Sequence, residues 1–78
     1  MIDPAEIQRR IASALPGATV EVRDTKGTGD HFEARVVAAA FVGKTRLQQH
    51  QMVYAPLKDL LATGELHALA LQTGVPET

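Results

Sequence analysis

The chain has 78 residues, of which 45% are apolar and 4% aromatic, with eight basic and nine acidic residues and no cysteine. This length suits a single domain, residues 1–78, with a small aliphatic core. A net charge of −1 argues against a protein that grips phosphate backbones, because such proteins usually carry a clustered positive excess. The missing thiols exclude a disulfide framework, a catalytic cysteine and a thiolate metal cage built by this chain alone.

No apolar run approaches the length that a membrane span requires. The first residues also lack the basic start and apolar centre of a signal peptide. We therefore expect a cytoplasmic protein that does not enter a membrane.

The first half of the chain predicts one helix and two strands. Asp3 is a typical helix cap, and apolar residues recur every three or four positions through residues 4–15, which predicts a helix with one apolar face. Residues 18–23 and 31–40 alternate between apolar and polar side chains, as half-buried strands do. A polar, glycine-bearing loop over residues 24–30 separates them, so the two strands predict an antiparallel hairpin with one wet face.

After Gly43 the apolar period changes from two residues to 3.6, which predicts a helical stretch as far as Leu61. Pro56 cannot donate a backbone hydrogen bond, so we expect a break near Tyr54 and two consecutive helices. Residues 66–73 predict a third strand. The side chains expected to face the core from the helical stretch are Leu47, His50, Val53, Tyr54, Leu57, Leu60 and Leu61.

The predicted fold class is α+β, a two-layer domain with the element order α-β-β-α-α-β. The long helical connection allows the third strand to lie parallel to a neighbour, which gives a three-stranded mixed sheet. The pattern does not determine which strand is central.

Three histidines are candidates for a functional site. His31 follows the glycine-bearing loop on the wet face of its strand, and His67 opens the third strand; each is either an ordinary accessible histidine or a metal ligand. His50 lies on the inward side of its helix. There it either packs the helix against the sheet, supports a metal ligand without binding the metal itself, or contacts nucleic acid. Without a cysteine or a paired carboxylate, these residues are too few for a closed zinc site, so another molecule would have to complete any metal site.

Catalytic motifs are lacking. There is no nucleophile elbow, and no carboxylate pair is placed on one face beside a histidine. The run from Gly43 to Thr45 resembles the end of a phosphate-binding loop, but Ala38 stands where that motif requires its first glycine. We therefore predict that the protein is not an enzyme.

Several short segments stand out when they are taken together. They are Asp30-His31-Phe32, Phe41-Val42-Gly43-Lys44-Thr45-Arg46, Gln48-Gln49-His50-Gln51-Met52-Val53-Tyr54, Leu57 with Leu60, His67-Ala68-Leu69 and Thr73-Gly74-Val75-Pro76. In these segments the chain resembles the BolA family. The resemblance covers residues 2–76, nearly all of the chain, and its motif set is specific when taken as a whole.

The resemblance implies a fold related to type II KH domains and a partnership with monothiol glutaredoxins of the Cys-Gly-Phe-Ser type. BolA-like proteins share a bridging [2Fe–2S] cluster with these glutaredoxins and glutathione, in cluster trafficking or in iron and redox regulation. On the BolA side, the resemblance implies His67 as one ligand. A second comes from the loop between the first two strands, where some relatives have a cysteine; here Thr28 stands in that turn, so His31 becomes the expected second ligand.

The resemblance also leaves alternatives open. Family members have been discussed as KH-like, nucleic-acid-binding transcription regulators, and here the matching contacts are Lys44 and Arg46, joined by Arg9 and Arg10. The Gly-x-x-Gly loop that a KH domain uses is incomplete, because Arg46 stands where its second glycine belongs. A metal-free interaction module and a homodimer of the apo protein are two further readings that the sequence does not decide.

Overall fold

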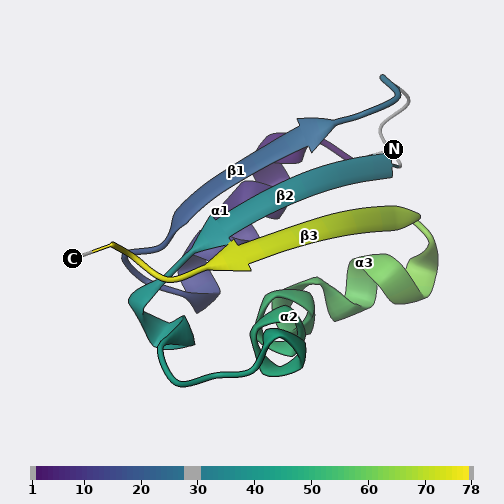
Figure 1. Cartoon of the computed structure of the whole chain (residues 1–78). Helices are drawn as coiled ribbons and strands as arrows, with labels where there is room; N and C mark the ends of the chain where they lie inside the picture. Colours follow the sequence, from purple (N-terminus) through teal and green to yellow (C-terminus); the bar gives the residue numbers. More distant parts are fainter. Residues whose placement is uncertain (1, 28–30, 78) are drawn as a thin grey trace.

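The computed structural model describes residues 2–27 and 31–77. Figure 1 shows the strands side by side, with the helical segments gathered on one side of them. The predicted order α-β-β-α-α-β is confirmed, with two single turns of 3-10 helix, η1 and η2, added to it. The elements are α1 (Pro4–Ala14), β1 (Thr19–Asp24), β2 (His31–Val37), η1 (Ala39–Phe41), α2 (Arg46–Tyr54), η2 (Ala55–Leu57), α3 (Lys58–Thr63) and β3 (Ala68–Gly74).

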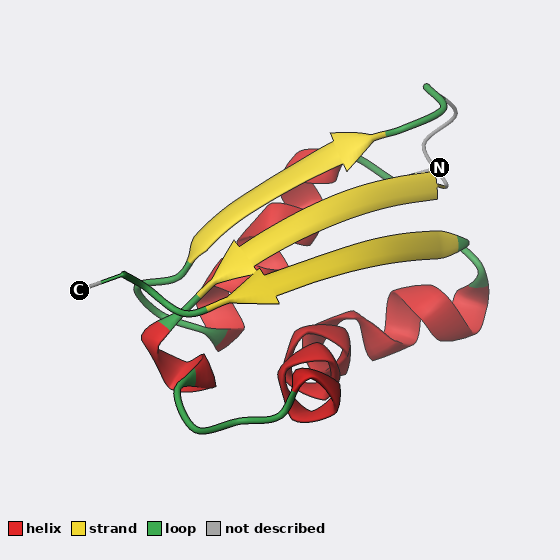
Figure 2. Cartoon of the chain, in the orientation of Figure 1, coloured by secondary structure: helices red, strands yellow, loops and turns green. Residues whose placement is uncertain are grey.

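The sheet is mixed, as predicted, and β2 is its central strand. β1 pairs with β2 antiparallel, and β3 pairs with β2 parallel. The helices cover one face of this sheet and leave the other open, so the domain has two layers (Figure 2). The parallel pair requires the chain to cross from the end of β2 back to the start of β3, and η1, α2, η2 and α3 make that crossing.

One aliphatic core fills the space between the two layers. Alternate residues of β2, namely Phe32, Ala34 and Val36, are buried because they face the helices, as the alternating pattern predicts. Phe41 is the largest side chain that is fully buried. The cluster consists of Ile2, Ile7, Ile11, Leu15, Val20, Phe32, Val36, Ala38, Phe41, Val53, Leu57, Leu60 and Leu66.

The predicted inward stripe of the second helix is partly wrong. Leu47 is 68% exposed, although the apolar pattern places it in the core. The side that packs on the sheet instead carries Gln49 and Val53, because the Gln49 amide donates hydrogen bonds to the Phe41 and Lys44 carbonyl oxygens at 3.3 and 3.1 Å. A glutamine with its polar atoms bonded can lie where the pattern expects an apolar residue.

The second strand is shorter than predicted. It ends at Val37 rather than Ala40, because the Phe41 N–H donates to the Ala38 carbonyl oxygen and turns the chain into η1. The predicted break near Tyr54 is confirmed, since η2 separates α2 from α3 at Pro56. This turn seats Leu57 in the core, where it is fully buried.

Arg10 connects α1 to α3 within the helical layer. Its guanidinium donates to Glu6 at 2.9 Å and to Asp59 at 2.7 Å. The hydrogen bond from Arg10 is the main reason that the pKa values of the Glu6 and Asp59 carboxyl groups are lowered. The same bonds, the one to Asp59 first, raise the pKa of the Arg10 guanidinium. Arg10 is therefore committed to the fold and is not a free cation for nucleic acid, contrary to the sequence reading.

We expect Arg10→Met to lower the melting temperature more at neutral pH than in acid. Carboxylates whose pKa is lower in the folded state than in the unfolded chain add stability that is complete above the unfolded pKa of about 4 and is lost as the pH falls through the folded value. Thermal unfolding of wild type and variant at about pH 7 and about pH 3 measures the difference. Arg9→Met is the matched control, because Arg9 pairs with Glu6 but does not reach α3; an equal loss for both variants at both pH values would contradict the prediction.

Candidate metal centre at the end of the sheet

The two histidines proposed as ligands lie side by side. Their ring centroids are 5.8 Å apart and the ring planes are inclined by 19°. His31 is the first residue of β2, and its register partner in β3 is Ala68, the residue after His67. Because β2 and β3 are parallel and start level with each other, both imidazoles reach the same end of the sheet.

The segments that carry the two rings are anchored on both sides. The Thr25 N–H and hydroxyl both donate to the His31 carbonyl oxygen, at 3.1 and 3.2 Å, and join the end of the hairpin to β2. Before His67, Gly64 adopts a left-handed conformation with φ of 81°, which ends α3. Buried Leu66 then fixes the chain to the core, and its N–H donates to the Leu60 carbonyl oxygen. His67 is exposed and His31 half-buried, so the pair is held at a defined position yet open to solvent.

The pair alone is an incomplete metal site. Over residues 2–27 and 31–77, no three histidine, aspartate or glutamate side chains come together in a group able to hold a metal ion. Thr28, in the loop position where some relatives have a cysteine, lies outside the described residues. Two imidazoles could supply no more than two of the four ligands of a tetrahedral metal site.

His50 lies elsewhere. It is half-buried on α2 and lines a shallow hollow with Arg46 and residues 71–73, towards the carboxyl end of β3. His67 is at the amino end of that strand, so His50 does not join the histidine pair.

Two residues of α2, Gln49 and Tyr54, hold the helix against the edge of β3; the sequence analysis expected Tyr54 to face the core and gave Gln49 no role. The Tyr54 hydroxyl donates to the Leu69 carbonyl oxygen at 3.1 Å. The Thr73 hydroxyl donates to the side-chain oxygen of Gln49 at 2.6 Å. Five residues turn an α-helix by about 140°, so helical periodicity alone does not place both side chains against β3.

Lys44 and Arg46 are both exposed at the start of α2. The helix begins with a capping box, in which the Thr45 hydroxyl accepts from the Gln48 N–H at 3.1 Å and the Gln48 side chain accepts from the Thr45 N–H at 2.9 Å. This cap fixes the two cations on a well-defined turn at the opposite end of β3 from His67.

The chain was compared with known proteins. The family model for BolA-like proteins matches residues 6–78. The chain is a member of the BolA family. Bovine BolA-like protein 1 is 35% identical over 97% of this chain, and the acid stress protein IbaG of Escherichia coli K12 is 34% identical over 91% of it. The match spans 62% of the bovine protein and 81% of IbaG, so this BolA chain covers only part of the longer mammalian relative.

Solved BolA structures share the fold of this chain. A BolA homologue from Coxiella burnetii superposes with a TM-score of 0.80 at 34% identity, covering 97% of this chain and 94% of that one. The BolA domain of SufE1 from Arabidopsis thaliana superposes with a TM-score of 0.81 at 32% identity, covering 94% and 91%. The expected α+β BolA-like fold is thus confirmed. None of the helices among the described residues of this BolA protein is long and apolar enough to cross a membrane.

Proposed function

We propose that this BolA-family protein co-ligates a [2Fe–2S] cluster with a monothiol glutaredoxin of the Cys-Gly-Phe-Ser type and glutathione. It would act in cluster trafficking or in iron and redox regulation, without catalysing a reaction itself. The observation that carries the proposal is the pair of imidazoles, His31 and His67, whose centroids lie 5.8 Å apart at an accessible end of the sheet.

The spacing of the pair fits ligation of one metal ion. Metal–imidazole bonds of about 2.0–2.1 Å and tetrahedral angles put the centroids of two ligated rings roughly 5 Å apart. The observed 5.8 Å is close to that separation, but the rings are stacked at 19°, so they must reorient before a nitrogen of each faces one ion. The fit is to two ligands only, which supports a cluster completed by thiolates from another molecule.

The chemistry of the donors supports a shared, releasable cluster. Neutral imidazole in place of thiolate raises the potential of a [2Fe–2S] centre, and ligation by histidine depends on pH because the ring must lose its proton. In this chain, Gly64 and Leu66 hold the His67 segment and Thr25 holds His31. The protein's own contribution is to present both rings on a fixed sheet end to an incoming partner.

The test is anaerobic reconstitution of the cluster on a monothiol glutaredoxin with glutathione, titrated with this protein and followed by visible circular dichroism. We expect a new spectrum that saturates at one copy of this protein per glutaredoxin, and its loss with His67→Ala. An unchanged glutaredoxin spectrum in the presence of excess wild-type protein would overturn the proposal. A stable but colourless complex would instead indicate an interaction module without a metal.

A second candidate is nucleic-acid binding at the start of α2. Lys44 and Arg46 are exposed, and neither forms an ion pair with another described residue. From Ala34 to Lys58 the sequence has four basic residues and no acidic one, despite the net charge of −1. Binding to duplex DNA should then weaken steeply with salt, and Lys44→Ala should reduce the salt slope by about one.

A further inference from the structure

β1 is an edge strand of the described sheet. It pairs with β2 on one side only. The Thr25 N–H bonds to the His31 carbonyl oxygen, and in an antiparallel ladder the bonded pairs alternate, so Arg23 and Glu21 also direct their backbone groups towards β2. The backbone N–H and C=O groups of Val20, Val22 and Asp24 therefore point away from the sheet. Such a row is a template for pairing with another strand.

We propose that two copies of this chain pair through β1, antiparallel, with Val22 of each copy on the twofold axis. The result is a continuous six-stranded sheet. This inference concerns a surface outside the histidine pair and does not rest on the proposed cluster function.

The charges on β1 select this register. A twofold antiparallel pair can be centred on residue 21, 22 or 23. Centring on Glu21 opposes two carboxylates, and centring on Arg23 opposes two guanidinium groups, and like charges directly opposite each other are destabilising. Centring on Val22 sets Glu21 of each copy opposite Arg23 of the other, twice by symmetry.

The backbone geometry agrees with the charges. With Val22 on the axis, the outward-pointing groups of Val22 meet each other and those of Val20 meet Asp24, so every bonded pair joins groups that already face outward. Glu21 and Arg23 then form the pairs without backbone bonds, whose Cα atoms approach to about 4.5 Å and whose side chains lie closest.

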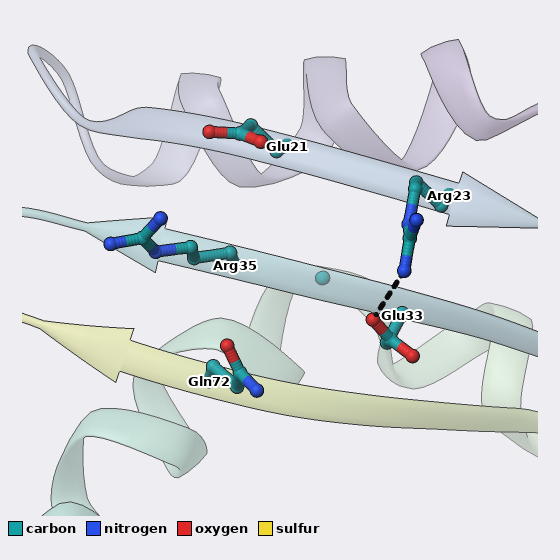
Figure 3. A pocket seen from close by; sticks show the side chains of 6 residues that line it. Glu21, Arg23, Glu33, Arg35 and Gln72 are labelled. Carbon is teal, nitrogen blue, oxygen red and sulfur yellow. Dashed lines mark hydrogen bonds and ion pairs between the residues drawn. The ribbon is translucent and has the colours of Figure 1, made fainter.

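The side chains of β1 are available for this pairing. Figure 3 shows Glu21 and Arg23 on the open face of the sheet, with Arg23 turned to Glu33. The Arg23–Glu33 pair measures 2.9 Å, but the Arg23 side chain is 76% exposed and can serve a second carboxylate. Glu21 forms no ion pair with another described residue. Val22 is half-buried against the core, and a second copy would cover its remainder.

The helix behind β1 does not oppose the pairing. Arg10 directs one flank of α1 towards η2 and α3. At 100° per residue, the opposite flank carries Ala5, Gln8 and Ala12, which are exposed and uncharged. Two copies of α1 can therefore approach each other along this flank without a repelling charge.

The first test is sedimentation equilibrium over a concentration series. We expect a monomer–dimer equilibrium for wild type, about tenfold weaker for either Glu21→Arg or Arg23→Glu, and restored when both substitutions are combined, because the double exchange recreates opposite pairs. Lys58→Glu, an exposed charge reversal at the start of α3, is the control and should dimerise like wild type. A wild type that stays monomeric throughout the series, or a double variant no better than the singles, would overturn the proposal.

The second test reads the register without changing the charges. Because the chain has no cysteine, single-cysteine variants give unambiguous cross-links. The proposed register opposes Thr19 of one copy to Thr25 of the other, whereas neither faces itself. A mixture of Thr19→Cys and Thr25→Cys under mild oxidation should give the mixed disulfide in excess; equal or greater cross-linking of each variant with itself would rule out this register.

Discussion

Phe41→Ala is expected to leave most molecules unfolded at neutral pH and room temperature. Phe41 is fully buried, and it enters the core from the single turn η1 that follows β2. Truncating a buried phenylalanine to alanine costs about 3–5 kcal/mol. A domain of this size has a total stability of roughly 3–5 kcal/mol, so this one cavity removes most or all of it.

Far-ultraviolet circular dichroism with urea titration measures this effect. The neighbouring residue provides the matched control, because Val42 is 65% exposed and Val42→Ala should change the free energy of unfolding by about 0.5 kcal/mol or less. A Phe41→Ala variant that melts within a few degrees of wild type would show that the core closes around the cavity, contrary to the prediction.

The parts of the fold that were predicted correctly are those that depend on residues close together in the sequence. The alternation through β1 and β2 gave the hairpin, and Pro56 gave the break between α2 and α3. The prediction that Leu47 faces the core was wrong. Apolar periodicity does not predict that a polar side chain can face inward when its polar atoms are hydrogen-bonded, as Gln49 does through bonds with Phe41, Lys44 and Thr73. Those partners are up to 24 residues away in the chain.

In the candidate site too, the sequence predicts individual residues but not their proximity. His31 and His67 could each be selected from the sequence, but their proximity depends on β2 being central and on β3 running parallel to it with His31 level with Ala68. No local pattern encodes that register. Arg10 likewise reads as a free surface cation until the fold brings Asp59, 49 residues later, to its guanidinium.

His31→Ala is expected to abolish the shared cluster spectrum as completely as His67→Ala, if the proposed function holds. In the proposed site the two rings, 5.8 Å apart, form one donor set, so losing either would leave an iron with an open position. The combined variant should then be no worse than the single ones, since residues that act as a unit are not additive. His50→Ala is the matched control, because His50 lies by a separate hollow on α2 and should leave the spectrum unchanged.

His31→Cys distinguishes a ligand from a residue that only shapes the sheet end. A thiolate in place of the imidazole should keep the cluster bound but change its spectrum and lower its reduction potential. A purely structural His31 would give the wild-type spectrum and potential in any variant that folds. If His31→Ala itself retains the wild-type spectrum, the second ligand is another group, and the pairing with His67 serves to orient that ring instead.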